Sequence, residues 1–403
     1  MHKNKKYIWA LLLGIFIFHG ILEDCFPTLK IFDECIALLC FPLALIDFWK
    51  TKDDTVNRLA KSKRMELAFL VAFLLCGFTG NLIYRFQPLW VVLASAVLSA
   101  KFFMILISAG FIQKDLQVKL EEQEFAVEIL SVIWFGYYIL SLIFPKVLVQ
   151  PAAWDVCAKA SILFALLIFC NHKRVWLYRI SLLLMITMLV LSGKEKAYGA
   201  MLVFVILYYA IVHKKVQTKI RYILYMAVPV ALLAWDKIYC HYIQVQNKYP
   251  KSIMTNVSLQ IAKDYFPIGT GFGTFGSTYA TIHYSPVYYL YGIAENKVLS
   301  EESKLYLTDV FWPILFGETG VLGTVIYCAL ILILFIQIQR VFYYNKKKYM
   351  LLIFMFVYML ITTFSEAGFM QPMIMVFAFV MGTLLEEYEE KRDYKMRYFN
   401  KKD

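Results

Sequence analysis

Two short stretches of this chain carry charged residues whose types and spacing could do chemistry on an anionic substrate. Lys194 and Lys196 stand two positions apart in the turn SGKEKAYG, and Asp309 and Glu318 belong to the later stretch TDVFWPILFGETGVLG. Lysine ammonium groups donate hydrogen bonds to phosphate, and a carboxylate can take a proton from a hydroxyl group. These residue types therefore indicate acid–base chemistry beside a bound anion.

A third stretch, PIGTGFGTFGS, is rich in glycine and includes the spacing G-x-G-x-x-G. Glycines free the backbone to present several N–H groups to one anion, and this spacing is typical of dinucleotide-binding loops. Downstream, Tyr284 and Tyr288 offer flat rings to sugars and hydroxyl groups for hydrogen bonds. We therefore expect this stretch to line a site for phosphate and sugar groups. The glycines concerned are Gly269, Gly271, Gly273 and Gly276.

Each of these features also has a simpler structural interpretation. Lys194 and Lys196 can belong to a solvated turn in which Glu195 neutralises one of them. Asp309 can cap the start of a helix. Glu318 is flanked by glycines, which would let another helix or a substrate approach closely. The glycine- and tyrosine-rich stretch can be an aromatic belt on the membrane surface, with glycine turns between short helices.

The elements that must position these residues are membrane helices. Hydrophobic residues make up 61% of the 403-residue chain and aromatic residues 17%, and the mean hydropathy is +0.61, far from a soluble protein. A bilayer core of roughly 30 Å needs about 20 helical residues, and apolar runs of that size recur along the chain. We predict an all-α integral membrane protein with about 12 transmembrane helices. The predicted spans are residues 7–22, 32–49, 65–84, 88–112, 124–144, 155–170, 174–193, 196–213, 220–243, 309–338, 348–368 and 370–387.

Basic loops set the expected orientation, because Lys and Arg are retained on the cytoplasmic side of a membrane. These loops alternate along the chain and share a face with its two ends, so we expect both termini in the cytoplasm. The net charge of +12 follows from this topology and from contact with anionic lipid, not from nucleic-acid binding. The predicted organisation is transmembrane helices 1–9 in residues 1–243, an extracytoplasmic loop in 244–308, helices 10–12 in 309–390 and a basic cytoplasmic tail in 391–403.

The expected extracytoplasmic position of the glycine stretch argues against a dinucleotide site. No pool of NAD or ATP is expected there, and neither a long strand before the glycines nor an amphipathic helix after them completes the motif. The six histidines and eight cysteines show no metal-ligand spacing, so we predict no metal site and no cofactor.

A few ionisable residues fall within or beside the predicted spans. Lys101 interrupts the fourth span, where it either snorkels along its stem, the favoured interpretation, or faces the bundle interior. Asp155 and Lys159 stand four residues apart and are expected to form a structural ion pair on one helix face. Glu366, between the last two spans, either ends a helix or forms a wall of the same cavity.

Taken in order, these stretches resemble the bacterial O-antigen ligase and polysaccharide polymerase superfamily of integral membrane glycosyltransferases. The resemblance rests on SGKEKAYG after the seventh span, PIGTGFGTFGS and HYSPVYYLYG in the outer loop, and DVFWPILFGETGVLG entering the next span. In the ligase branch, a His opens a segment with Glu-Thr-Gly and G-x-x-G. Here Glu318 and Gly323 match that segment, whereas the His position falls on Asp309, which looks more like the polymerase branch.

The resemblance implies a polymerase that joins undecaprenyl-pyrophosphate-linked oligosaccharide repeat units into a surface polysaccharide, such as a capsule, an exopolysaccharide or O-antigen. The reaction would take place on the outer face of the cytoplasmic (inner) membrane. The implied partners are the lipid-linked oligosaccharide, the bilayer, and a flippase and a chain-length regulator of the same pathway. The family holds the pyrophosphate with arginines, and those regions carry Lys194 or Lys196 and Lys251 or Lys248 here. Lysine supplies a point charge where arginine supplies a planar fork.

The resulting hypothesis makes Asp309 the general base and Lys194, Lys196 and Lys251 a pyrophosphate clamp. His283 is the alternative base, because histidine readily exchanges a proton near neutral pH. If the lysines supply the charge, the reaction needs neither metal nor nucleotide. The remaining lining residues are the glycines above together with Tyr284, Tyr288 and Glu318.

Two other functions fit parts of the same pattern. A ligase would move finished glycan from the lipid carrier to another acceptor. An exporter or flippase would carry the lipid-linked sugar along a path lined by Lys101 and Glu318. The sequence shows neither the internal repeats nor the paired broken helices expected of a transporter.

Overall fold

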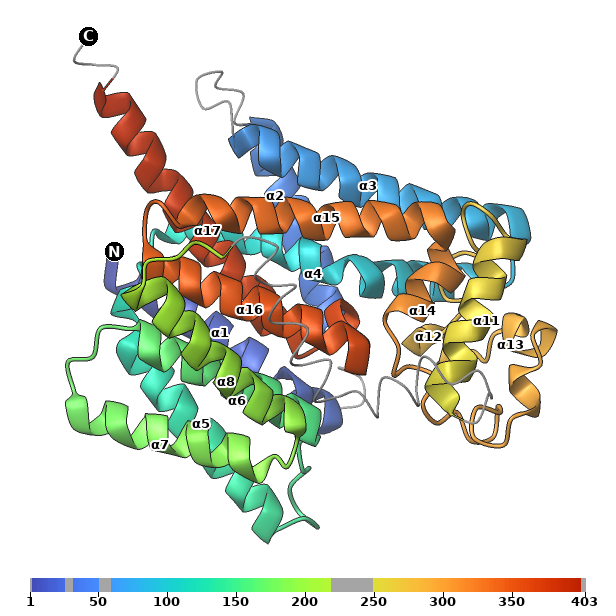
Figure 1. Cartoon of the computed structure of the whole chain (residues 1–403), viewed down its shortest axis with the longest axis horizontal. Helices are drawn as coiled ribbons and strands as arrows, with labels where there is room; N and C mark the ends of the chain where they lie inside the picture. Colours follow the sequence, from blue (N-terminus) through green and yellow to red (C-terminus); the bar gives the residue numbers. More distant parts are fainter. Residues whose placement is uncertain (1, 26–31, 51–58, 219–248, 400–403) are drawn as a thin grey trace.

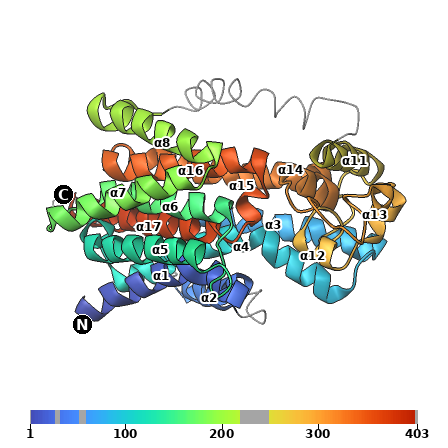
Figure 2. The same cartoon turned by 90° about the horizontal axis from the view of Figure 1, so that it is seen from below.

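The computed structural model describes residues 2–25, 32–50, 59–218 and 249–399. Within these ranges every regular element is helical and no strand occurs, as the all-α prediction requires. The longer helices run roughly lengthwise and side by side in both views, forming one bundle (Figures 1 and 2).

The bundle helices overlap the predicted spans wherever the structure describes them, although α15 begins at Gly320 and not at residue 309, and α17 continues beyond residue 387 to Phe399; the predicted span 220–243 lies outside the described residues. In the described part of the chain, six helical stretches are long and apolar enough to cross a membrane: Ser62–Tyr84, Leu89–Leu116, Glu124–Ile143, Glu195–His213, Trp312–Val341 and Lys346–Ser365. They indicate a multi-pass membrane protein. The bundle helices are α1 (His2–Cys25), α2 (Phe32–Lys50), α3 (Leu59–Tyr84), α4 (Leu89–Leu116), α5 (Glu124–Ile143), α6 (Ala153–Phe169), α7 (Val175–Leu191), α8 (Glu195–Tyr208), α15 (Gly320–Val341), α16 (Lys346–Ser365) and α17 (Ile374–Phe399).

The centre of the bundle is α4, which packs along both α2 and α17. Its side chains are buried around the whole helix, including Val91, Phe102 and Ile105. A helix that is apolar all round is expected to be a core element, because it has no face that favours water. The predominantly apolar composition of α4, interrupted by Lys101 and a few small polar residues, therefore explains its central position.

Two lysines inside the bundle, Lys159 and Lys101, are held in ion pairs. Lys159 of α6 lies 2.7 Å from Asp155 one turn earlier, and its ammonium group lies 4.8 Å from the centre of the Trp134 ring. The predicted pair is thus confirmed. Lys101 of α4 is fully buried and lies 3.3 Å from Glu34 of α2, so the favoured interpretation that it snorkels is wrong. A buried ammonium group needs a carboxylate close by, since desolvation of an unpaired charge is costly.

Residues 249–311 form a cap at one end of the bundle. The cap contains α11 (Pro250–Asp264), α12 (Thr278–Ile282), α13 (Pro286–Leu290) and the short turn η5 (Ile293–Glu295). It leads through α14 (Trp312–Ile314) and the π-helical turn η6 (Leu315–Thr319) into α15. In both views the cap lies at the end opposite to the start of α1 and the end of α17 (Figures 1 and 2). From residue 249 onward, the predicted outer loop is therefore a folded layer of short helices.

The short cap helices begin at residues suited to helix starts. Ser277 and Ser285 precede α12 and α13, and each side chain accepts a backbone N–H bond at 3.3 Å. Pro250 and Pro286 open α11 and α13, where the missing N–H of proline would have no helical partner anyway. These local signals place the cap helices although none of the three is apolar enough for a membrane span.

Candidate functional site

The glycine stretch of the cap closes around the carboxyl group of Glu318. Glu318 lies in η6, and its side chain is buried. Its Oε1 accepts hydrogen bonds from the backbone N–H groups of Gly273 at 2.9 Å and Phe275 at 3.3 Å, and from Ser277 Oγ at 2.6 Å. The N–H groups that could hold a phosphate are therefore used by the chain's own carboxyl group.

Close packing explains why this stretch needs glycine. A Cβ on Gly269 would lie 2.5 Å from the backbone nitrogen of Gly320, and a Cβ on Gly271 would lie 2.5 Å from that of Asn81. Both residues also have left-handed backbones, with φ of +70° and +99°. The Gly271 N–H donates to the carbonyl oxygen of Glu318 at 2.8 Å. The structure thus buries all the glycines predicted to bind substrate: Gly269, Gly271 and Gly273 in the contact between cap and bundle, and Gly276 inside the cap beside Met254 and Val310.

Two bundle side chains that the sequence pattern did not single out complete this contact. Asn81 of α3 pairs with the backbone of Phe272, donating to its carbonyl oxygen at 2.9 Å and accepting from its N–H at 2.7 Å. Ser95 of α4 donates to Glu318 Oε2 at 3.4 Å. Polar residues within apolar runs are the signal that could have indicated both, since such groups need partners at membrane depth.

Tyr284 and Tyr288, predicted to line a sugar site, lie in the core of the cap. Tyr288 is fully buried, and its hydroxyl accepts the N–H of Gly276 at 2.8 Å. Tyr284 is also buried and donates to the carbonyl oxygen of Leu299 at 2.9 Å. Burial raises the pKa of Tyr284 to about 12 and that of Tyr288 further, so both hydroxyls stay protonated. The structure therefore gives both residues a packing role.

His283, the alternative base, lies on the surface of the cap. Its ring is exposed and meets the edge of Trp90 at a centroid distance of 4.8 Å. Its carbonyl oxygen accepts from Gln87 at 3.0 Å. Within the described residues, no hydrogen bond or ion pair joins its side chain to any predicted lysine or to Asp309. The structure thus places His283 apart from the charged residues described next.

A charged cluster forms at the end of α16, which lysine side chains of α8 and of the cap helix α11 both reach. Lys196, in the first turn of α8, forms an ion pair with Glu366, which ends α16; their side chains are 11% and 15% exposed. Lys251, in the first turn of α11, donates to the carbonyl oxygen of Ser365. Segments far apart in the sequence thus bring two lysines to the same end of α16.

Asp309 lies close enough to Lys251 for their charges to interact. Burial lowers the pKa of Lys251; the charges of Asp309 and Glu366 oppose that shift, whereas Lys196 adds to it. Asp309 is partly exposed, and its side chain makes no hydrogen bond or ion pair with the described residues. Phe311, not Asp309, precedes α14, so the helix-cap interpretation does not apply. We call Lys196, Lys251, Asp309 and Glu366 the charged cluster.

Lys194, the other lysine of the predicted clamp, is exposed at the start of α8. No contact with a described residue brings its ammonium group to the charged cluster. Lys248 lies outside the described residues. Of the two lysines in the turn SGKEKAYG, only Lys196 therefore lies in the charged cluster.

Two buried polar atoms beside the charged cluster have no hydrogen-bond partner among the described residues. They are Oε2 of Glu366 and the indole nitrogen of Trp312. The Trp312 ring lies 6.4 Å from the ring of Phe364, an exposed residue just before Ser365. Buried polar groups without partners are uncommon, and a bound ligand is one way to satisfy them. The indole N–H of Trp312 can therefore donate to a ligand, Oε2 of Glu366 can accept from one, and the Phe364 ring offers an aromatic surface.

The charged cluster has the components for transfer from an anionic leaving group. Its two ammonium groups can neutralise a diphosphate, and the carboxylate of Asp309 can accept a proton. Of the residues predicted to act on substrate, the structure brings Lys196 and Lys251 to the end of α16, and Asp309 is near enough to Lys251 for their charges to interact. Among the described residues, no group of three His, Cys, Asp or Glu side chains could hold a metal ion.

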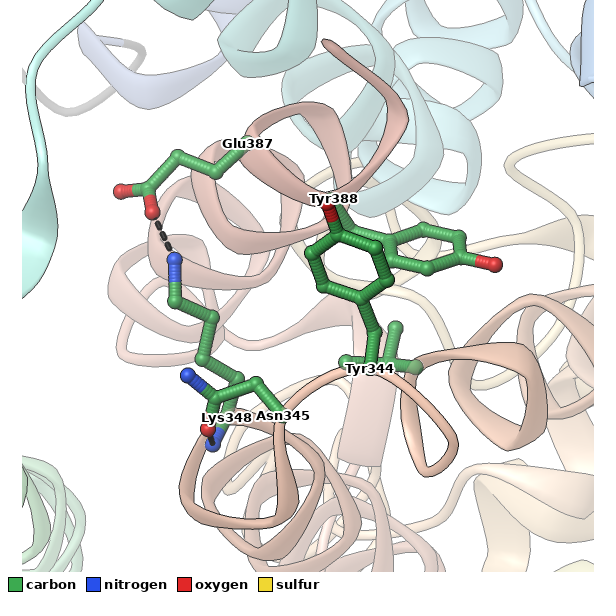
Figure 3. Close-up of a pocket in the computed structure, with 6 residues that line it drawn as sticks. Tyr344, Asn345, Lys348, Glu387 and Tyr388 are labelled. Carbon is green, nitrogen blue, oxygen red and sulfur yellow. Dashed lines mark hydrogen bonds and ion pairs between the residues drawn. The ribbon is translucent and has the colours of Figure 1, made fainter. Parts of the chain in front are cut away.

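A cavity at the opposite end of the bundle has a different character. It measures about 240 Å³ and lies between the start of α16 and α17, where Lys348 pairs with Glu387 (Figure 3). The Asn345 side chain accepts from the Lys348 N–H at 3.1 Å and donates to Glu121 at 3.2 Å. Because these charged and amide groups are already paired within the protein, we do not assign them a catalytic role.

No protein-family model matches the chain, and no curated protein matches its sequence. The resemblance to O-antigen ligases and polymerases therefore remains an expectation from the motifs. The geometry of the charged cluster is the firmer basis for inferring function.

Proposed function

We propose that this protein is a membrane glycosyltransferase that polymerises undecaprenyl-pyrophosphate-linked oligosaccharide repeat units into a surface polysaccharide. The observation that carries the proposal is the charged cluster at the cap end of an apolar bundle, in which Lys196 and Lys251 reach the end of α16 and Asp309 is near enough to Lys251 for their charges to interact. A lipid diphosphate needs cations at the level where its polyprenyl chain leaves the bilayer. The motif resemblance agrees with this substrate class.

The two lysines differ in how they are held. Lys196 pairs with Glu366, which fixes its position, whereas Lys251 donates to a backbone carbonyl oxygen and has no carboxylate partner in an ion pair among the described residues. Lys251 can therefore approach a diphosphate without first breaking an ion pair. Through this ion pair, Glu366 would hold the Lys196 ammonium group in the orientation that contacts the diphosphate.

In the proposed step, a hydroxyl oxygen of one repeat unit attacks the anomeric carbon of a second lipid-linked chain. The new carbon–oxygen bond forms as the bond from that carbon to the diphosphate oxygen breaks, and its electron pair leaves with undecaprenyl diphosphate. Asp309 takes the hydroxyl proton and later releases it to water, while Lys196 and Lys251 stabilise the departing charge. The glycosyl diphosphate supplies the driving force, so no redox partner is needed.

An exporter is the less favoured alternative, because the residues expected to line its path are occupied. Lys101 pairs with Glu34 inside the bundle, and Glu318 is enclosed by the cap. A ligase would use the same chemical step with a different acceptor. The polymerase and ligase alternatives therefore differ in substrate and not in the charged cluster.

Reconstitution in liposomes tests the proposal. Purified lipid-linked repeat units are supplied as the sole sugar substrate, and products are resolved by length on gels. We expect a ladder from the parent protein, a ladder from Lys263→Ala, and loss of the ladder from Lys251→Ala and Asp309→Asn. Lys263 is the matched control because it is an exposed lysine on the same helix, α11. A parent-like ladder from Asp309→Asn would remove Asp309 from the mechanism, and a parent that extends no units would contradict polymerisation.

A further inference from the structure

The cap carries an open groove at the end of α11 away from Lys251. The groove measures about 470 Å³ and is lined by Gln260, Asp264, Tyr265, Leu290 and Tyr291. Gln260 and Asp264 stand one helical turn apart on α11, so they share a face of that helix. Leu290 ends α13, and Tyr291 follows it. Two short helices of the cap thus form the two walls.

The lining has the chemistry that binds sugars. Tyr291 donates its hydroxyl to Asp264 Oδ2 at 2.8 Å, which leaves Oδ1 able to accept from a ligand. The Gln260 amide is exposed and has no hydrogen-bond partner among the described residues. Sugar hydroxyls both donate and accept, so a carboxylate and an amide one turn apart suit them.

An aromatic wall supports this polar pair. Tyr265 packs edge-on against Tyr84 at 4.7 Å and lies 6.1 Å from Phe86, in the α3–α4 connection. These contacts hold the Tyr265 ring in place at the groove while its residue stays partly exposed. A fixed aromatic face is a low-entropy surface on which the apolar face of a sugar ring can pack.

We infer that this groove is a saccharide subsite, which holds the glycan of a lipid-linked substrate while its diphosphate occupies the charged cluster. The inference rests on the proposed function for the cluster. Lys251 and Asp264 mark the two ends of α11, and 13 residues of helix rise about 20 Å. A chain anchored by its diphosphate at one end of α11 would need several sugar units to reach the groove. The subsite therefore favours oligosaccharides over single repeat sugars.

The charge of the groove narrows the ligand class. Asp264 presents a carboxylate, and the lining includes no lysine or arginine. Uronic acids and other acidic sugars would be repelled, whereas neutral sugars and amino sugars would be accepted. The structure thus points to a neutral or amino-sugar segment at this position of the glycan.

Binding of lipid-free oligosaccharides tests the subsite without requiring catalysis. The full chain in lipid nanodiscs is titrated with a panel of neutral, amino-sugar and uronic-acid oligosaccharides. We expect saturable binding of a neutral or amino-sugar member, and an affinity loss of about tenfold in Gln260→Ala combined with Tyr291→Phe, since the first removes a hydrogen bond to the sugar and the second removes the bond that holds the Asp264 carboxylate in place. Lys263→Ala, beside the groove but not in its lining, should bind as the parent does. Preference for acidic members, equal binding by the double variant, or no binding by any member would each overturn the inference.

Product length in host cells tests the same subsite with the natural glycan. We expect the Gln260→Ala, Tyr291→Phe variant to make polymer with a shorter modal length, because the growing chain is held less well. Parent-like length would overturn the subsite while leaving the proposed polymerase intact. Conversely, unchanged surface polysaccharide after deletion of the gene would defeat the proposed function, whereas saturable oligosaccharide binding in nanodiscs would still support a sugar site in the groove.

Discussion

The cap end of this molecule holds two sets of groups that could bind an anion, and they differ in what already occupies them. The backbone N–H groups of Gly273 and Phe275 bind the buried carboxyl group of Glu318. In the charged cluster, by contrast, Lys251 is held by a backbone carbonyl, and Asp309 has no hydrogen-bonded partner among the described residues. The first set is completed from within the chain, whereas in the second only Lys196 has a carboxylate partner, Glu366.

This difference distinguishes polar groups that hold the fold together from polar groups that can act on a substrate. Donors that are satisfied internally fix the cap on the bundle, and the glycines serve that contact. Charges that are incompletely paired keep electrostatic capacity for a substrate. The buried pairs Lys101–Glu34 and Lys159–Asp155 belong with the first set, because each cation there has a carboxylate partner.

Glu318→Ala is the change with the largest expected effect. It leaves the two backbone N–H groups and Ser277 Oγ without their acceptor, at a cost of about 1–3 kcal/mol for each unsatisfied group. We expect a markedly lower Tm in detergent and rapid proteolysis of the cap. Ser95→Ala, which removes the longer contacts of Ser95 Oγ with Ser277 Oγ at 3.2 Å and Glu318 Oε2 at 3.4 Å, should have a smaller effect. A Glu318→Ala protein as stable as the parent would show that the carboxyl group does not hold the cap.

Lys251→Ala and Asp309→Asn should affect activity and not stability. Loss of a charge that stabilises the leaving group, or of a base, typically slows a reaction about 100-fold or more. Both side chains are partly exposed, so we expect changes in unfolding free energy within about 0.5 kcal/mol. Rates come from the liposome assay and Tm from the same preparations. A large fall in Tm that accompanies the lost activity would assign these residues to packing.

The pKa of Lys251 predicts a pH dependence of substrate binding. Burial lowers that pKa below the ordinary lysine value, so Lys251 loses its charge at a lower pH than an exposed lysine does. Affinity for a diphosphate should be full below this pKa and fall as pH rises through it, by up to about tenfold per pH unit. Lys251→Arg is the control, because arginine keeps its charge and should remove the fall. Identical pH profiles for parent and variant would exclude Lys251 from binding.

Tyr288→Phe should have the smallest effect. The hydroxyl accepts one hydrogen bond from Gly276 inside the cap, which is worth about 1 kcal/mol of stability. Polymer yield should be unchanged, because the ring is fully buried. Lost activity with an unchanged Tm would place Tyr288 against the substrate and restore its predicted role in the lining.

Much of the fold could be predicted from the sequence because it depends on local patterns. Apolar runs of membrane-spanning length predicted the bundle helices, and the four-residue spacing of Asp155 and Lys159 predicted their ion pair. The acids and lysines at the cap end were also recognisable, since charges beside apolar spans are unusual. The partner of each charged residue could not be predicted from these local patterns.

The pairings that the sequence did not reveal join distant segments. Lys101 was expected to reach water, but α2 supplies Glu34 within the bundle. The glycine stretch was expected to hold a substrate phosphate, but η6 supplies Glu318, more than forty residues later. Similarly, the partner of Lys196 is Glu366, 170 residues away. Tertiary packing alone decides these pairings.

The most direct test of the charged cluster is equilibrium binding of a short-chain polyprenyl diphosphate to the full chain in lipid nanodiscs. The parent and Lys263→Ala should bind it with equal affinity, and Lys251→Ala should bind it at least tenfold more weakly while keeping the parent's Tm. Equal affinity of the parent and Lys251→Ala would contradict the assignment of this cluster as the diphosphate site.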